Sequence, residues 1–452
     1  ASGDTVTLAS GASQSGFGRT GTVDWQTGDI KTGDFTAANG EGYFVNTTSG
    51  AVTMTMPSGS AGAIVSIQDY NKTFDSNALT VTPASGEKIN GGTASGTLLI
   101  STEGQGLTFV YVDGTVGWKT VHENEFTQGG SIFITATGGT ITTSGDCKIH
   151  TFTGPGTFCV SAGGSPTNAV ISYMVIAGGG GGGDGRNNNN CGAAGGGAGG
   201  FREFKSPVTP YTASPLDGNP GGTSISITGA TAIPVTVGAG GVGASGPGPS
   251  ALTPVRPTSG SNSIFSTVTS TGGGRGGSGC GTGKCAEYCG AAGGSGGGSA
   301  KTGRSAGAGN TPPVSPSQGF PGGVGIDPGT ARGSGAGGGA TAAGQAGQPG
   351  GGGAGGAGAT TSINGTPTAR AGGGGGGGTS GETAAGAGGT GGGGAGGVHP
   401  SASCTSAGSG TAGTTNTGGG GGGMGSGGPP GASSAVSGNG GSGIVIIRYK
   451  FQ

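Results

Sequence analysis

Two apolar stretches decide how this chain folds: Tyr173-Met-Val-Ile-Ala177, which runs directly into Gly178–Gly183, and Ile444-Val-Ile-Ile-Arg-Tyr-Lys-Phe451. An apolar β-branched strand that stays unpaired is an aggregation hazard. We therefore expect the two stretches to pair with each other in one sheet. The pairing predicts that residues 178–443 form a long glycine-rich excursion whose two ends are fixed by that sheet.

The composition restricts what this excursion can be. Glycine supplies 124 of the 452 residues, against about 7% in average proteins, and only 8% of the residues are charged. Each interior glycine costs a helix about 1 kcal/mol relative to alanine, so long helices are not expected. A flexible linker is the usual interpretation of such a tract. Disorder, however, normally accompanies high net charge, and this chain carries a net charge of −1.

Uninterrupted glycine runs such as Gly372–Gly378 and Gly418–Gly423 suit polyproline-II geometry, which has three residues per turn and no internal hydrogen bonds. Several such helices packed side by side can satisfy each other's N–H and C=O groups, because the lack of Cβ lets their backbones approach closely. The strict Gly-X-Y period of collagen is absent. We therefore predict packed polyglycine-II helices over 178–443, with loops that carry specificity.

The N-terminal part has a different pattern. Residues 1–24 are rich in Ser, Thr and Gly, which is typical of an extended arm. From 25 to 126, short alternating segments recur about every eight to twelve residues, which indicates a β-sandwich or a barrel-like module. The expected strands are Gly42–Asn46, Ala51–Met56, Ala63–Gln68, Leu79–Thr82, Thr97–Ser101, Leu107–Val112 and Trp118–Val121.

A second β-region begins at residue 131 and frames the glycine-rich body. Its expected strands, with a hairpin turn at Gly154-Pro-Gly156, are Ile132–Ile134, Lys148–Phe152, Thr157–Val160, Ala232–Val237 and Ser263–Ser270. The predicted fold class is all-β, with a small antiparallel β-sandwich module at 25–126 and a C-terminal β-framed glycine-rich domain. That domain comprises a β-framework at 131–177, the polyglycine-II body at 178–443 and a closing strand at 444–452.

Residues that catalysis needs are sparse. The histidines His122, His150 and His399 lie near no Ser or Cys in a catalytic motif, and no pair of carboxylates can be nominated for glycoside hydrolysis. Matches to G-x-G-x-x-G are inevitable in glycine runs and lack the strand-then-helix context of a pyrophosphate site. No catalytic residue, cofactor or metal site is predicted, and the chain is not expected to be an enzyme.

Charge and hydropathy exclude two classes of partner. The 18 basic and 19 acidic residues form no basic patch, so nucleic acid is not an expected partner. No apolar run is long enough for membrane insertion. The start, Ala1-Ser-Gly-Asp-Thr5, lacks the pattern of a signal peptide, which favours synthesis in the cytoplasm and release by lysis.

Seven cysteines occur without a C-x-x-C pair, which disfavours a zinc ribbon. Three of them, Cys280, Cys285 and Cys289, lie close together in the sequence. A disulfide or a metal site remains open for this cluster, and small buried thiols are the favoured interpretation.

The residues also resemble known families. The segments Asp29–Thr36, Gly40–Thr53 and Gly104–Asp113 resemble β-modules in structural proteins of cyanophages and other marine phages. The glycine-rich domain of phage tail fibres and related adhesins is similar in the order of Tyr173–Gly180, Val235–Gly241, Gly260–Gly273 and Gly443–Phe451. The resemblance implies a virion protein, made in the host cytoplasm, that forms a homotrimer and contacts the host surface. In distal adhesins of T-even-like phages, packed polyglycine-II helices carry the host-binding loops.

Three functions are consistent with these patterns. The first is a tail fibre or receptor-binding adhesin that binds a host glycan or protein and joins other virion proteins through its N-terminal arm and β-module. The second is a virion part without receptor binding, such as a head fibre, a baseplate component or a capsid decoration. The third is a bacterial extracellular filament or surface protein. The candidate receptor-contact residues are Asn187, Asn188, Asn189, Asn190, Gln318, Phe320, Ile326, Asp327, His399, Thr405 and Asn416.

Overall fold

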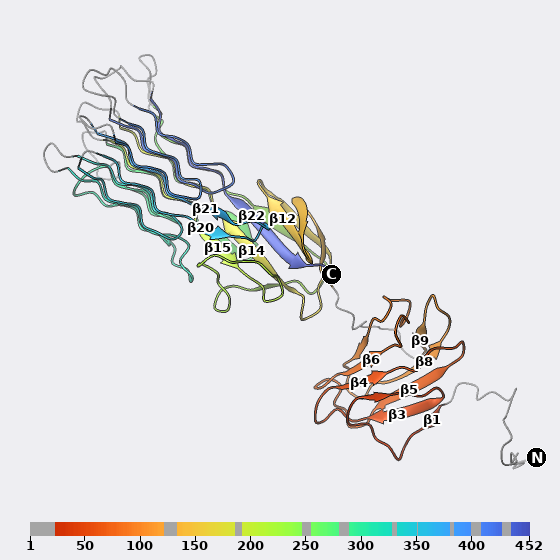
Figure 1. The fold of residues 1–452 in the computed structure, drawn as a ribbon. Helices are drawn as coiled ribbons and strands as arrows, with labels where there is room; N and C mark the ends of the chain where they lie inside the picture. Colours follow the sequence, from red (N-terminus) through yellow and green to blue (C-terminus); the bar gives the residue numbers. More distant parts are fainter. Residues whose placement is uncertain are drawn as a thin grey trace, which may run out of the picture. The chain divides into compact units, whose positions relative to one another are not determined.

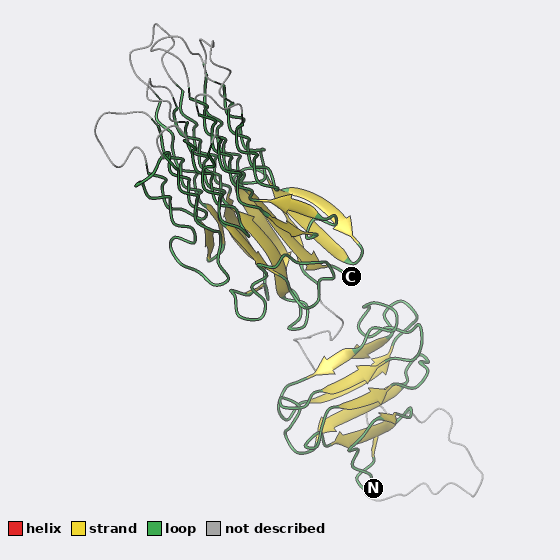
Figure 2. Ribbon diagram, turned by 60° about the vertical axis from the view of Figure 1, so that its left-hand side comes forward, coloured by secondary structure: helices red, strands yellow, loops and turns green. Residues whose placement is uncertain are grey.

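The computed structural model of the protein describes residues 23–121, 133–185, 192–245, 255–279, 289–327, 332–349, 351–379, 384–398, 408–426 and 435–452. Over these residues all regular elements are β-strands, as the predicted all-β class requires. The chain divides into two compact units, Ala1–Ile132 and Phe133–Gln452 (Figures 1 and 2). The described part contains no helix that could cross a membrane. The expected N-terminal arm lies outside the described residues up to Thr22.

The first unit consists of two sheets, with the strand orders β1-β3-β5-β8-β9 and β2-β4-β6-β7. Its strands are β1 (Asp24–Trp25), β2 (Phe35–Thr36), β3 (Glu41–Val45), β4 (Val52–Thr55), β5 (Ile64–Asp69), β6 (Leu79–Thr82), β7 (Leu98–Ile100), β8 (Gly106–Tyr111) and β9 (Trp118–Thr120). Each of the seven strands predicted in this region is present, and no end is displaced by more than one residue. Period-two alternation and turn residues therefore located the strands well.

The prediction of an antiparallel module is wrong for most of this unit. From β1 to β6 the chain alternates between the two sheets. Each strand thus returns to its sheet in the direction of its predecessor, and the pairs β1–β3, β3–β5, β2–β4 and β4–β6 are parallel. A strand of the opposite sheet serves as the crossover that parallel neighbours need. Evenly spaced strands are compatible with both windings, so the spacing alone could not distinguish them.

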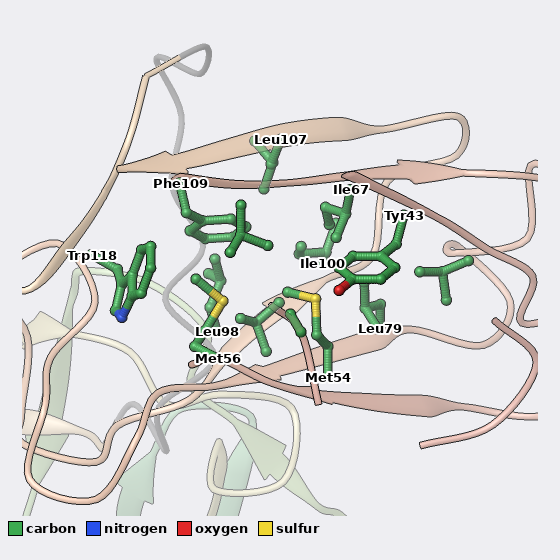
Figure 3. Close-up of a cluster of buried hydrophobic side chains, with 14 of the residues drawn as sticks. Tyr43, Met54, Met56, Ile67, Leu79, Leu98, Ile100, Leu107, Phe109 and Trp118 are labelled. Carbon is green, nitrogen blue, oxygen red and sulfur yellow. The ribbon is translucent and has the colours of Figure 1, made fainter. Parts of the chain in front are cut away.

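Side chains from both sheets fill the space between them (Figure 3). Phe109 of β8, Met54 of β4 and Trp118 of β9 are fully buried. The Trp118 indole N–H donates to the Glu87 carboxylate at 3.1 Å, which satisfies the polar group that this large side chain brings into the core. The first unit is therefore held together by an ordinary apolar core.

The second unit begins with a β-framework of two packed sheets, of orders β11-β12-β22-β14-β15 and β10-β13-β17-β18-β19, with β16 paired to β14. Its strands are β10 (Thr135–Thr137), β11 (Thr140–Ser144), β12 (Cys147–Phe152), β13 (Gly156–Ala162), β14 (Val170–Ile176), β15 (Phe201–Phe204), β16 (Ile225–Ser226), β17 (Thr231–Thr236), β18 (Ser263–Phe265), β19 (Val268–Ser270), β20 (Ala359–Thr361), β21 (Thr368–Arg370) and β22 (Ile444–Lys450). Phe158, Phe265 and Tyr449 belong to the cluster that fills the space between the two sheets.

The predicted pairing of the two apolar stretches is confirmed. β14 and β22 are antiparallel neighbours, with Tyr173 opposite Ile447 and Ile176 opposite Ile444. Nearly every residue of both strands is buried, because a second apolar cluster covers their other face and includes residues of the β20–β21 hairpin region such as Ile363. Burial on both faces explains why these strands are continuously apolar rather than alternating.

The predicted hairpin around Gly154-Pro-Gly156 is wrong. β12 pairs with β11 and β22, whereas β13 pairs with β10 and β17. The turn therefore carries the chain from one sheet of the framework to the other. The Gly-Pro-Gly sequence is compatible with a hairpin and with a connection between two sheets. Which of the two forms depends on the strands with which the flanking segments pair.

Between β14 and β22 the chain forms extended segments without strand assignment, which we call arms. They lie side by side and extend away from the framework (Figures 1 and 2). Neighbouring arms 178–183 and 194–200 are antiparallel, since Ala177 N–H donates to Gly200 and Gly183 N–H donates to Ala194. We call the ends of the arms at the framework the inner end of the bundle. The opposite ends, near Gly183 and Met424, are its outer end.

Candidate functional site

The arm 178–183 explains how a bundle without side chains is held together. Its six N–H groups donate in rotation to three neighbouring arms, and the rotation repeats every three residues. The acceptors, from Gly178 to Gly183 in order, are the carbonyls of Ser261, Gly441, Gly197, Thr258, Gly438 and Ala194. Its carbonyls accept from three further arms, through the N–H groups of Gly273, Gly241, Gly421, Gly276, Ala244 and Met424. Every backbone polar group of this buried segment therefore has a partner, as burial requires.

Close approach of the arms leaves no room for a side chain at the glycines of the arm 178–183. A Cβ placed on Gly178 would lie 2.0 Å from the Ala239 carbonyl oxygen, and one on Gly181 would lie 2.0 Å from that of Val242. One on Gly180 would lie 2.2 Å from the carbonyl oxygen of Gly274. These separations are far below van der Waals contact, so the glycine run is a packing requirement. The interior of the bundle can hold no substrate.

Exposed side chains occur where an arm faces outward, at every third residue, and the side chains buried inside the bundle are mostly small, such as those of Ala194 and Ser295. Along one arm Ala239, Val242 and Ser245 face outward, and along another Val436, Asn439 and Ser442 do. The same period of three that rotates the hydrogen bonds also turns each third residue away from the neighbouring arms. Functional side chains on the bundle are therefore confined to these outward positions and to the ends of the arms.

The structure places Gln318 inside the molecule. Its side chain is fully buried, its Oε1 accepts from Thr271 N–H at 2.9 Å, and its Nε2 donates to the Pro312 carbonyl at 3.0 Å. Because both polar atoms are used within the chain, Gln318 fixes the loop 310–318 against the framework. It does not contribute to an exposed contact surface.

Phe320 and Asn416 lie at the inner end of the bundle. Phe320 is 36% exposed, and its N–H donates to Gly339. Asn416 occupies the turn between two arms with a positive φ of 60°, and its side chain accepts from the Ser442 hydroxyl at 3.1 Å. Asn tolerates this left-handed conformation better than most residues, so a turn role accounts for it.

Ile326 and Asp327 lie at the outer end. Ile326 and Gly333 exchange backbone hydrogen bonds at 2.7 and 3.0 Å. The Asp327 carboxylate accepts from the Arg332 guanidinium at 2.7 Å, and its N–H donates to the Thr302 hydroxyl at 2.6 Å. These bonds order the outer end of two arms, so the predicted residues are split between opposite ends of the bundle.

The remaining predicted residues lie outside the described residues: Asn187, Asn188, Asn189, Asn190, His399, Thr405, Cys280 and Cys285. Cys289, the third member of the cysteine cluster, is a half-buried free thiol. Across the described ranges, no group of three or more His, Cys, Asp and Glu side chains is arranged to hold a metal ion.

Exposed valines on the arms were missed by sequence reasoning. Val242, Val324 and Val398 are 47%, 49% and 48% exposed, and each lies toward the outer end of its arm. A search for apolar residues at spacings of three from other non-glycine residues would have found Val242, which follows Ala239 and precedes Ser245. These valines add exposed apolar groups at the outer end that the prediction does not name.

A buried carboxylate in the framework is structural. Burial raises the pKa of Glu203 above its ordinary value, although Ser214 N–H at 3.0 Å and the Thr361 hydroxyl at 2.5 Å donate to its two oxygens. Arg370 is also buried, and its burial lowers the pKa of the guanidinium. With both oxygens occupied, Glu203 connects a loop to β20 and offers no acid–base chemistry to an external substrate.

The bundle and its two framing strands coincide with a known sequence family. The model of the glycine-rich domain family matches residues 153–450. The chain belongs to this family. The match begins at the corner between β12 and β13 and ends in β22, so it spans the arms and most of the β-framework but not the first unit. No curated protein sequence matches the chain.

Proposed function

We propose that the arms form a bundle of packed polyglycine-II helices that acts as a rigid display scaffold. The observation that carries the proposal is the rotation of hydrogen bonds along 178–183, with a repeat of three residues and six neighbouring arms. Three residues per turn is the period of the polyproline-II helix. Because every N–H and C=O of the buried arm 178–183 is paired, the bundle resists bending and opening there without an apolar core.

On this scaffold, the chain acts as a tail fibre or receptor-binding adhesin on a virion surface. The proposal rests on the resemblance to phage fibres and on the geometry of the glycine-rich domain. Outward side chains are sparse along the arms, and exposed apolar groups such as Val324 and Val398 lie toward the outer end. A rigid rod with interaction groups at its far end suits attachment to a surface glycan or protein of a host cell. No reaction is assigned to the chain.

The first experiment tests host attachment. Full-length protein labelled with a fluorophore should bind host cells, and the triple variant Val242→Asp, Val324→Asp, Val398→Asp should lose that binding while unfolding at the same temperature. Phe320→Asp, in the same arm as Val324 but at its inner end, is the matched control and should bind as the unsubstituted chain does. Equal binding by the triple variant, or no binding by the parent chain, contradicts the proposal.

The second experiment tests the bundle itself. In the full-length protein, amides of 178–183 and 371–378 should exchange with deuterium far more slowly than free glycine amides, because each donates within the bundle. Exchange at the rate of an unstructured chain would refute the packed scaffold. Sedimentation equilibrium gives the mass of the assembly, and we expect a trimer with three times the chain mass of 41.4 kDa.

A further inference from the structure

A row of aromatic side chains lies on the outer face of the first unit. Trp25 and Tyr70 are 40% and 54% exposed, and Phe44 between them is half-buried. The ring centroids of Trp25 and Phe44 are 4.9 Å apart, and those of Phe44 and Tyr70 are 6.5 Å apart. Large aromatics are normally buried, so three adjacent rings at the surface of one small unit need an explanation.

Three separate segments of the first unit contribute one ring each to this row. Trp25 on β1 lies over Gly42 of the neighbouring β3, where a Cβ would come within 2.8 Å of the indole ring. Phe44 is two residues further along β3 and points to the same side. Tyr70 directly follows β5, and its N–H donates to the Val45 carbonyl at 2.9 Å. The rings are therefore fixed by parallel strand pairing and not by a mobile loop.

Hydrogen-bonding groups border the row. Beside Tyr70, Asn71 Nδ2 donates to the Thr48 hydroxyl at 3.0 Å, and that hydroxyl donates to Asn46 Oδ1 at 2.6 Å. On the other side, Gln68 stands opposite Phe44 in the β3–β5 register. Apolar ring faces next to neutral amides and hydroxyls match the two kinds of surface on a sugar ring, which has C–H faces and hydroxyl edges.

Charge selects the class of sugar. The described residues 23–121 contain nine Asp and Glu side chains against four Lys and no Arg. One of these lysines, Lys31, forms an ion pair with Asp29 and lies over the rings of Phe35 and Tyr43. An acidic unit with this cation already engaged repels phosphorylated, sulfated or carboxylated polymers. The negative ring faces instead complement the polarised C–H groups of a neutral pyranose.

We propose that Trp25, Phe44 and Tyr70 form a binding platform for a neutral glycan chain. The platform is an exposed row that runs from β1 across β3 to the end of β5, so it suits consecutive units of a polysaccharide better than one small molecule in a pocket. It lies in the first unit and does not depend on the outer end of the bundle. The platform would therefore act as a second, independent contact, and two weak sites on one chain raise overall affinity through effective concentration.

The test uses the full-length chain and the two tryptophans it contains. Trp118 is fully buried, so acrylamide quenching of fluorescence reports mainly on Trp25. Maltohexaose, cellohexaose and chitohexaose are the neutral probes, and polygalacturonate is the anionic one. At least one neutral probe should protect Trp25 from quenching and give a heat of binding by calorimetry, whereas polygalacturonate should do neither.

Trp25→Ala and Tyr70→Ala should each weaken that binding by roughly tenfold or more, since exposed aromatic anchors dominate such contacts. The matched control is Leu99→Ala, which removes a 41% exposed side chain from β7 in the other sheet and should leave the binding unchanged. If Trp25→Ala lowers the unfolding temperature, Tyr70→Ala still decides the question. Unchanged affinity in both variants, protection by polygalacturonate alone, or no protection by any probe overturns the platform. If the first unit instead binds a virion protein that none of the sugars displaces, the proposal is also overturned.

Discussion

The two units solve the same physical problem in opposite ways. The first unit excludes water with side chains, and Trp118, Phe109 and Met54 have no exposed surface. In the arms of the second unit, removal of side chains lets backbones pack, and the N–H and C=O groups supply the contacts. Apolar burial is non-directional and tolerates some repacking, whereas hydrogen bonds need fixed distances and angles. Side-chain loss should therefore damage the first unit, and side-chain gain should damage the arms of the second.

The largest effect is expected from removing a core side chain of the first unit. Phe109→Ala should destabilise that unit by about 3–5 kcal/mol, because it loses apolar burial and leaves a cavity. Hydrogen exchange followed by peptide mass spectrometry should show faster opening for 23–121 and no change for the arms. Leu99→Ala, at a 41% exposed position, should change neither unit by more than about 0.5 kcal/mol. A concerted loss of protection in both units would mean that they do not differ as described.

The converse change adds a single methyl group to an interior arm. Gly181→Ala places a Cβ 2.0 Å from the Val242 carbonyl oxygen, so the arms must separate, and we expect a loss of about 3 kcal/mol confined to the second unit. Gly221→Ala is the matched control, since nothing lies within 4 Å of its Cβ position. Denaturant unfolding monitored by exchange distinguishes them. Equal stability of Gly181→Ala and Gly221→Ala would contradict the claim that packing of the arms requires glycine at position 181.

The stability of the two units should also depend differently on pH. Burial lowers the pKa of His150 below its ordinary value of 6.5, and its ring nitrogens lie 2.8 Å from the Gly138 carbonyl oxygen and 3.0 Å from the Tyr449 hydroxyl. The folded state keeps the imidazole neutral while the unfolded chain takes up a proton. Stability is therefore complete above pH 6.5 and falls as the pH drops from 6.5 toward the lowered pKa, by up to about 1.4 kcal/mol per pH unit.

Residues 23–121 contain no histidine, so this source of pH dependence is absent from the described part of the first unit. Denaturation midpoints between pH 7 and pH 5 provide the measurement. His150→Gln should reduce the slope of the second unit, whatever it does to the absolute stability. A loss of stability toward pH 5 that persists in His150→Gln would assign the effect to other groups. Glu203 is not among them, because burial raises its pKa and a carboxyl with a raised pKa stabilises the folded state as the pH falls.

The smallest effect is expected where the framework joins the arms. The Ser270 hydroxyl donates to the Val175 carbonyl at 2.7 Å, and its loss in Ser270→Ala should cost about 1 kcal/mol. Thr269, its neighbour on β19, is exposed, so Thr269→Ala should stay within about 0.5 kcal/mol of the parent chain. Urea unfolding of the two variants side by side tests the difference. If both variants lose the same unfolding free energy, the hydrogen bond of the buried Ser270 hydroxyl adds no stability where the framework joins the arms.

Sequence reasoning worked where the signal is local. Alternation located the strands of the first unit, and two continuous apolar runs located β14 and β22 and their pairing. It failed for Gln318. This residue interrupts the glycine-rich sequence with hydrogen-bonding groups, yet the structure uses both polar atoms of its buried side chain within the chain. A side chain that can bond a ligand can equally bond its own backbone, and only burial distinguishes the two.

By itself, the sequence determined that the chain is all-β, that a glycine-rich body spans 178–443, and that Tyr173–Ala177 and Ile444–Phe451 fix its ends. These features follow from residue chemistry, since a missing Cβ and an apolar period act within a few residues of each other in the chain. Only the tertiary structure decided the parallel winding of β1–β6, the separation of β12 and β13 into different sheets, and which arm neighbours which. Glycine runs are chemically identical, so nothing in their order specifies a partner. The partner of each arm is therefore defined only by the hydrogen bonds among the arms in the folded bundle.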